Sequence, residues 1–310
     1  MQLDHLVHTL GHHLKRRFGE RVHKLALNAD FTCPNRDGTL GRGGCTFCNV
    51  RAFSRAANLP LDQQLEQGKL DADRARKYLA YFQAYTNTYA EVSVLREMYE
   101  TALRSADVVG LCVGTRPDCV PDAALDLLAG YRDRGAEVWL ELGLQSAFDA
   151  TLERVNRGHG FAAYRDAVTR AHVRGLQVCT HLIVGLPGET ATMCRITLDQ
   201  VLDAGVEGIK LHPLHIVRGS RMAAQFRRGE LAPVGFDDYV TIAADLIRAT
   251  PADVVFHRVS ATAKRDVLLA PDWGAERWPS MQAIADNLAR HGGQGTTLGQ
   301  PWAPQPVLVP

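Results

Sequence analysis

The chain has 310 residues, of which 46% are hydrophobic and 22% charged, and its 35 basic residues nearly balance 34 acidic ones. This length suits one domain of α/β-barrel size, and the composition excludes a disordered chain or a strongly basic one. We identify no signal peptide and no apolar run of about 18 residues, and therefore expect a cytoplasmic protein that does not enter a membrane and whose cysteines stay reduced.

Strand-like and helix-like segments alternate along the first two thirds of the chain. A basic amphipathic stretch predicts an N-terminal helical extension over residues 1–23. Strands are predicted at Lys24–Ala29, Phe82–Thr88, Val108–Gly114, Val138–Leu144, Gln177–Val184 and Gly208–Leu214. Helices are predicted at Pro60–Leu79, Glu91–Ala106, Asp122–Arg134 and Glu189–Ala204, with two short helices ending near Arg174. Residues 24–217 are thus predicted to form an α/β fold, a partial (β/α)6 TIM-type barrel of parallel strands.

The alternation loosens beyond residue 217, and residues 218–310 are predicted to form a C-terminal α/β extension with a tail. Helices are expected at Arg221–Arg228, Asp237–Ala249 and Pro279–Arg290, and a strand at Val254–Val259. The segment 292–310 is rich in glycine and proline, which predicts a docked or mobile tail rather than a further element.

Three cysteines, Cys33, Cys45 and Cys48, lie in one glycine-rich loop after the first predicted strand. Three thiolates can hold a cubane iron–sulfur cluster and leave one iron open to a small ligand. A zinc site and a Cys-x-x-Cys redox pair remain alternatives, although zinc would need a further close cysteine or histidine pair. The four other cysteines, Cys112, Cys119, Cys179 and Cys194, are most simply buried small hydrophobes.

Polar and glycine residues collect where the predicted strands end, and in a parallel barrel these ends meet at one edge. The segments are Thr86-Asn87-Thr88, Gly114–Asp118, Glu141–Ser146, His181–Glu189 and Lys210–His215. The histidines among them are more often hydrogen-bonded residues of a strand end than ligands.

Residues Lys24–Cys48, which include Asn28-Ala-Asp-Phe-Thr-Cys-Pro-Asn-Arg-Asp-Gly-Thr and Gly43-Gly-Cys-Thr-Phe-Cys, resemble the YhcC-type radical S-adenosylmethionine (SAM) enzymes, relatives of the Elongator radical subunit. The resemblance implies a [4Fe-4S] cluster held by Cys33, Cys45 and Cys48, with SAM on the fourth iron. The first cysteine gap is eleven residues rather than the three of the commonest pattern, and such lengthening is typical of this branch.

The resemblance also implies cofactor-binding roles for residues at the strand ends. Thr86, Asn87 and Thr88 occupy the place of a Gly-Gly-Glu segment whose backbone binds the methionyl amine. Glu141 and Gln145 match polar contacts to the ribose or methionyl group of SAM, and Arg157 matches a partner of its carboxylate.

The adenine of SAM is matched to the segment after the fifth predicted strand, which contains Gly185 and Gly188 with Ile183. Phe47 and His212 complete the expected set of cofactor-binding residues. Gly185 and Gly188 could instead form only a turn, and Glu141 could be an ordinary barrel carboxylate.

The expected activity is reductive cleavage of SAM to a 5′-deoxyadenosyl radical that abstracts hydrogen from a substrate. Kinship with Elongator implies a tRNA uridine as that substrate, with an electron donor such as flavodoxin or ferredoxin as partner. Basic residues on both sides of the predicted barrel, Arg16, Arg17, Arg21 and Lys24 and then Arg218, Arg221, Arg227 and Arg228, could converge on one face. A small-molecule radical enzyme and a non-catalytic zinc- or iron–sulfur-binding interaction protein remain the alternatives.

Overall fold

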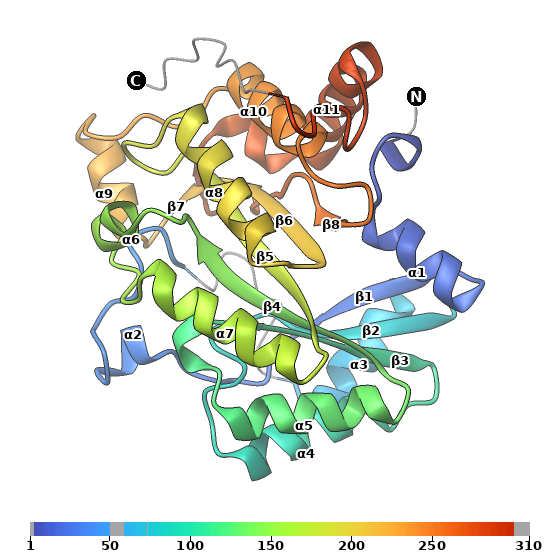
Figure 1. The fold of residues 1–310 in the computed structure, drawn as a ribbon. Coiled ribbons are helices and arrows are strands. Elements are labelled where there is room, and N and C mark those ends of the chain that lie inside the picture. The colour runs from blue at the N-terminus through green and yellow to red at the C-terminus, as the bar shows by residue number, and fades with distance from the viewer. Residues whose placement is uncertain (1–2, 50–58, 73, 301–310) are drawn as a thin grey trace.

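The computed structural model describes residues 3–49, 59–72 and 74–300. Seven parallel strands form one curled sheet in the order β1-β2-β3-β4-β5-β6-β8 (Figure 1). They span Val22–Leu27 (β1), Lys77–Phe82 (β2), Val108–Thr115 (β3), Glu137–Gln145 (β4), Gln177–Val184 (β5), Gly208–Pro213 (β6) and Val255–Arg258 (β8). The predicted partial barrel of parallel strands is confirmed, with one strand more than the sequence indicated.

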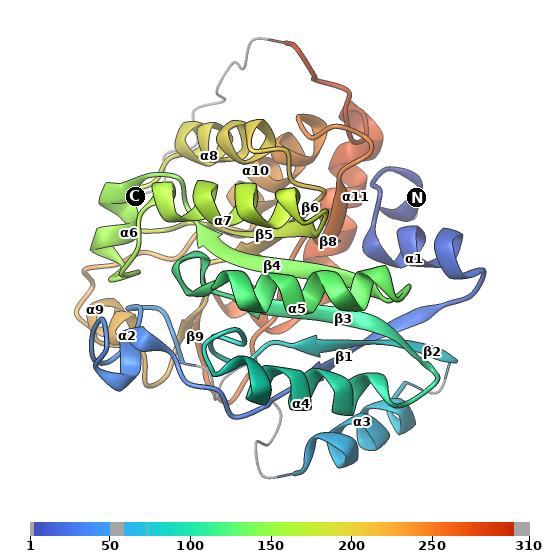
Figure 2. The same ribbon diagram turned by 60° about the horizontal axis from the view of Figure 1, so that its bottom comes forward.

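Helices cover the convex face of the sheet, and Figure 2 shows α3, α4, α5, α7 and α8 lying across it in this order. The main helices are α1 (Leu10–Phe18), α3 (Leu61–Leu70), α4 (Val92–Leu103), α5 (Asp122–Asp133), α7 (Phe161–Val173), α8 (Ala191–Asp203), α10 (Phe236–Arg248) and α11 (Arg277–His291). Shorter helices are α2 (Pro34–Asp37), α6 (Asp149–Arg154) and α9 (Arg221–Arg227), and 3-10 turns in the described residues lie at Leu3–His5, Pro117–Cys119 and Asp272–Ala275. Crossover connections between neighbouring parallel strands place helices over the outside of the sheet.

Alternation along β4 explains how one strand serves two environments. Its outward residues Val138, Leu140, Leu142 and Leu144 join the large core between sheet and helices. Its inward positions are Glu137, Trp139, Glu141, Gly143 and Gln145. Because successive side chains point to opposite faces, a strand that is buried on both sides can carry charges toward the barrel interior.

The barrel interior is layered from the amino ends of the strands to their carboxyl ends. The lowest layer is apolar: Trp139, Leu79, Cys112 and Cys179 pack there with Leu10 and Leu14 of α1. A charged layer around Glu141 follows, and above it a cavity opens at the carboxyl ends. Helix α1 therefore closes the bottom of the barrel, while the top is left for the site.

The second strand was predicted in the wrong place. Helix α3 ends at Leu70 and β2 covers Lys77–Phe82, whereas the sequence indicated a helix to Leu79 and a strand from Phe82. Both faces of β2 are buried, so its apolar run lacks the polar alternation that would have set its limits.

The seventh strand, β8, comes from the segment that was expected to form the C-terminal extension. It pairs with β6, and Thr9 forms a bridge to Phe256 on its other side. A two-stranded antiparallel pair, β7 (Ile216–Val217) with β9 (Leu268–Ala270), lies beside the upper end of the barrel.

Candidate active site

The cysteine loop is fixed by hydrogen bonds to the loop between α6 and α7. Asn35 donates to the carbonyl of Asn156 at 2.6 Å, and Asn156 donates back to the carbonyl of Gly44 at 2.9 Å. Gly44 has φ +75°, and a Cβ there would lie 2.8 Å from Nε of Arg36. The positive φ favours glycine at this position, and a Cβ would in addition force the Arg36 side chain to move within the loop.

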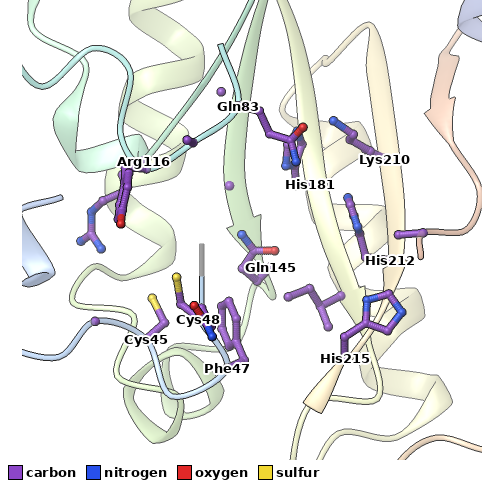
Figure 3. Close-up of a pocket in the computed structure, with 18 of the residues that line it drawn as sticks. Cys45, Phe47, Cys48, Gln83, Arg116, Gln145, His181, Lys210, His212 and His215 are labelled. Atoms are coloured by element: carbon purple, nitrogen blue, oxygen red, sulfur yellow. The ribbon is translucent and has the colours of Figure 1, made fainter. Parts of the chain in front are cut away.

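Cys33, Cys45 and Cys48 all line one cavity of about 270 Å³ at the carboxyl ends of the strands (Figure 3). Cys33 caps α2, and the amide of Cys48 donates to the carbonyl of Cys45 at 3.0 Å. The other four cysteines, Cys112, Cys119, Cys179 and Cys194, are buried outside the lining, which agrees with their interpretation as small core residues.

Cations and hydrogen-bond donors surround these thiols. Arg157 Nη1 lies 3.3 Å from Cys45 Sγ, and Nδ2 of Asn35 lies 3.9 Å from the same sulfur. Burial and the neighbouring Cys45 raise the pKa of the Cys48 thiol, while Arg36 acts in the opposite direction. Three thiols with positive neighbours and no fourth cysteine among the described lining residues fit a [4Fe-4S] cluster with one open iron.

Nine of the residues predicted from the sequence meet in this cavity: Cys33, Cys45, Phe47, Cys48, Thr86, Gln145, Arg157, Ile183 and His212. Arg157 is held by the carbonyl of Gly143, at 3.2 Å from Nε and 2.5 Å from Nη2. Gln145 has φ +82°, an unusual backbone conformation at the end of β4 that places it between the two sides of the cavity (Figure 3).

The five other predicted residues do not line the cavity. Asn87 donates to the carbonyls of Phe82 and Gly114, at 3.1 and 2.6 Å, and Thr88 bonds Thr115 at 2.6 Å, so both hold strand ends together. Gly185 and Gly188 have φ +91° and +77° in the turn after β5.

Glu141 is the fifth of these residues, and it is fully buried below the cavity. Its carboxylate accepts from Lys210 at 2.8 Å and pairs with Lys24, and it contacts His181 at 2.8 Å and His257 at 3.1 Å. Burial alone would raise the pKa of this carboxyl, but Lys210 and Lys24 hold it well below its usual range.

Several lining residues were not assigned from the sequence. Gln83 and Tyr85 follow β2, and the misplaced strand limits hid them. Arg116 is buried with its guanidinium on Asp118 at 2.8 and 2.9 Å, directly after β3, where the strand-end argument already pointed. Arg258 ends β8, so recognising the seventh strand would have found it.

Comparison with known proteins assigns the chain to a class. The sequence matches the Radical SAM superfamily over residues 37–201 and the Radical_SAM C-terminal domain over residues 206–290. The chain therefore belongs to the radical SAM superfamily, whose enzymes use a [4Fe-4S] cluster and SAM. The alternative of a non-catalytic metal-binding module is set aside by this membership.

Within that class the chain is similar to the YhcC proteins. It is 56% identical to Protein YhcC of Escherichia coli (strain K12) over 306 residues, 98% of this chain and 99% of that one. It is 40% identical to YtqA of Bacillus subtilis over 291 residues, 92% of this chain and 90% of that one. A tRNA uridine(34) acetyltransferase of Methanocaldococcus infernus is 26% identical over 137 residues, 43% of this chain and 25% of that one.

Among solved structures, an archaeal Elp3 of Methanocaldococcus infernus with an N-terminal deletion superimposes with a TM-score of 0.63 at 18% identity. The match covers 88% of this chain but only 64% of that one, and at this identity it shows the fold alone. No helix in the described part of the chain is both long and apolar enough to span a membrane.

Proposed function

We propose that this chain cleaves SAM reductively and directs the resulting radical at a substrate inside the barrel. The observation that carries this proposal is the meeting of three thiols with Arg157 and the ends of β2 to β6 in one cavity. When bound, the cluster supplies one electron that breaks the C5′–S bond of SAM, giving methionine and a 5′-deoxyadenosyl group that takes a hydrogen atom from the substrate.

The chain's own residues would bind and orient these groups. Cys33, Cys45 and Cys48 are the proposed ligands of the cluster, and Arg157 is the proposed partner of the SAM carboxylate. The backbone at Thr86 would receive the methionyl amine, and Gln145, Ile183 and Phe47 would contact the rest of SAM. The sequence also suggested His212 for this set, but it lies on the side of the cavity opposite the cysteines, where its ring faces the space left for the substrate. Walls formed by buried strand ends keep water from the reacting atoms.

The test is anaerobic reconstitution followed by reduction in the presence of SAM. We expect about four irons and four sulfides per chain and slow formation of 5′-deoxyadenosine without added substrate. Protein that binds the cluster but forms no 5′-deoxyadenosine under strong reduction would contradict the proposed reaction.

The proposed electron donor is a flavodoxin or a ferredoxin, because the cleavage consumes one electron at low potential. Arg42, Arg218 and Arg221 are exposed near the cysteine loop, where they suit an acidic redox partner. Free thiols at all seven cysteines support the cytoplasm as the location. Replacing the chemical reductant by reduced flavodoxin should sustain cleavage, with a rate that falls as salt rises.

For the substrate we propose a uridine in tRNA. The named function of the tRNA uridine(34) acetyltransferases supports this, as do the exposed arginines Arg218 and Arg227 on the side of α9. The two basic groups of the sequence do not converge. Arg17 pairs with Glu137 at the bottom of the barrel at 2.8 Å, and Lys24 is turned inward onto Glu141. Residues just before β1 lie at the amino ends of the parallel strands, opposite the cavity.

Binding of tRNA therefore depends on the arginines near the cavity alone. With about three phosphate contacts, the logarithm of affinity should fall against the logarithm of salt concentration with a slope on the order of −3. Substituting Arg218→Gln and Arg227→Gln together should reduce this slope by about 2, whereas Lys15→Gln with Arg16→Gln at the other end should not change it. Nucleosides from treated tRNA that show no mass change would reject this substrate.

A small molecule is the second candidate substrate. The cavity is lined by the barrel strands on its inner side, and this wall carries several cations, which suits a compact polar molecule.

A further inference from the structure

The cavity has a second side, formed by β5, β6 and β8, that faces the cysteine loop. Figure 3 shows His181, Lys210, His212 and His215 on this side and Cys45 with Cys48 on the other. Arg258, at the end of β8, also lines it. Of the described residues that line the cavity, none is an aspartate or a glutamate.

Positive charge on this side exceeds the negative charge beneath it. Lys210 and Arg258 line the cavity, while Lys24 of β1 and Glu141 lie in the charged layer below it. Together they contribute three positive charges and one negative charge, which leaves an excess of two. Burial lowers the pKa of Lys210 to about 8, so its ammonium group is still largely protonated at neutral pH. Buried charge without a counter-charge is costly, and a bound anion would offset that cost.

Two of the groups have hydrogen-bonding capacity to spare. The guanidinium of Arg258 makes no hydrogen bond or ion pair within the described part of the chain. The buried Nε2 atom of His212 has no hydrogen-bond partner there either. Arg258 acts electrostatically on Lys210, His212 and His215, which places all four groups around one space.

We propose that Arg258, Lys210 and His212 form a subsite that binds an oxyanion of the substrate, on the side of the cavity opposite the cysteines. The guanidinium offers parallel donors that match a carboxylate or a phosphate, the ammonium adds a point charge, and a neutral imidazole adds one N–H. This proposal rests on the proposed function in one respect, namely that the bound anion belongs to the substrate of the radical reaction. Binding of the anion itself does not require that reaction.

The oxyanion has two sources. A phosphate would come from a nucleotide, including one displaced from an RNA chain, whereas a carboxylate would come from a small organic acid. Titrating the cluster-loaded, SAM-saturated protein with inorganic phosphate and, separately, with acetate distinguishes these sources by calorimetry. No reductant is present, so the result does not depend on SAM cleavage.

We expect one of the two anions to bind saturably and more tightly than the other, with one site per chain. Arg258→Gln should weaken that binding roughly ten-fold to hundred-fold, and Arg258→Lys should recover part of the loss. The control is Arg265→Gln, which removes an exposed arginine paired with Glu276 outside the cavity and should leave the affinity unchanged.

Absence of saturable binding by both anions would overturn the proposal, and so would an affinity that Arg258→Gln does not alter. Binding that is seen only without SAM and is displaced by it would assign the cations to the cofactor and overturn the proposal as well. Failure of the radical chemistry itself would appear separately, as missing 5′-deoxyadenosine in wild-type protein that still binds the anion.

Discussion

The two sides of the cavity hold their cations in different ways. On the cysteine side, Arg116 is paired with Asp118, and Arg157 is occupied by Gly143 and by the sulfur of Cys45. On the opposite side, Lys210 and Lys24 share one carboxylate, and Arg258 has no partner among the described residues. The first arrangement is nearly complete within the chain and suits a cluster that stays bound. The second needs a counter-charge from outside, which suits a molecule that enters and leaves.

The largest effect is expected from removing a cysteine, which tests whether the cysteine side of the cavity holds a bound cluster. Cys48→Ala should abolish cluster binding and its visible absorption, because two thiolates cannot hold the cubane in place. Iron and sulfide assays measure this loss. The control is Cys194→Ala, a buried core position outside the cavity, which should keep its iron. Full iron content in Cys48→Ala would remove this cysteine from the ligand set.

Glu141 is the buried counter-charge that Lys24 and Lys210 share beneath the opposite side of the cavity. Glu141→Gln leaves Lys24 and Lys210 buried without a counter-charge, and should lower the free energy of unfolding by about 3–5 kcal/mol in urea titrations. Glu137→Gln is the matched control, because the ion pair of Glu137 is with the half-exposed Arg17, which solvent screens, and a glutamine oxygen can still accept from Trp139 Nε1. Equal losses of unfolding free energy in the two variants would show that removing a carboxylate from the charged layer costs no more than removing one at the bottom of the barrel.

Falling pH should lower the stability of the fold through the buried histidines on the side of the cavity formed by β5, β6 and β8. Burial lowers the pKa of His181 and of His215 from 6.5 to about 4. Between these values the unfolded chain binds more protons than the folded one, so the stability present above pH 6.5 declines as the pH falls toward 4. Each histidine accounts for up to about 3 kcal/mol.

Measuring the free energy of unfolding at several pH values tests this, with His215→Gln as the informative variant. Its stability should fall less steeply over the same window, since one of the protons taken up on unfolding is missing. A slope identical to that of the wild type would show that His215 binds the same number of protons in the folded and unfolded states.

The smallest effect concerns Arg157, where the proposed cofactor role competes with its contact to Cys45. Arg157→Ala should weaken SAM binding by about 1.5–3 kcal/mol, the range for charge-assisted hydrogen bonds. Iron content decides the interpretation: retained iron with weaker SAM binding supports the carboxylate role, and lost iron assigns Arg157 to the cysteine loop. An unchanged dissociation constant would remove it from the SAM site.

The sequence predicted the cysteine side better than the opposite side. Cys33, Cys45 and Cys48 are close in sequence, so their spacing in one glycine-rich loop was enough to predict an iron–sulfur site. Gln145 and Ile183 followed from the rule that strand ends meet. Arg258 depends on β8 joining the sheet far along the chain, a tertiary pairing that no local pattern records. Gln83 and Tyr85 were hidden because β2 is apolar on both faces and gives no sign of where it stops.

The described part of the expected docked or mobile tail, residues 292–300, lies against residues 6–8, and this bears on the order in which the barrel can fold during synthesis. Gln294 donates from its backbone to the carbonyl of Leu6 at 2.9 Å and accepts from the amide of His8 at 2.8 Å. Thr9 meets Phe256, and α1 packs on β8 as well as on β1. Residues 6–9 and α1 are therefore synthesised long before their partners on β8 and at Gln294. We expect completion of the barrel to be a late folding step, with the apolar face of α1, including Leu10 and Leu14, uncovered until β8 has been made.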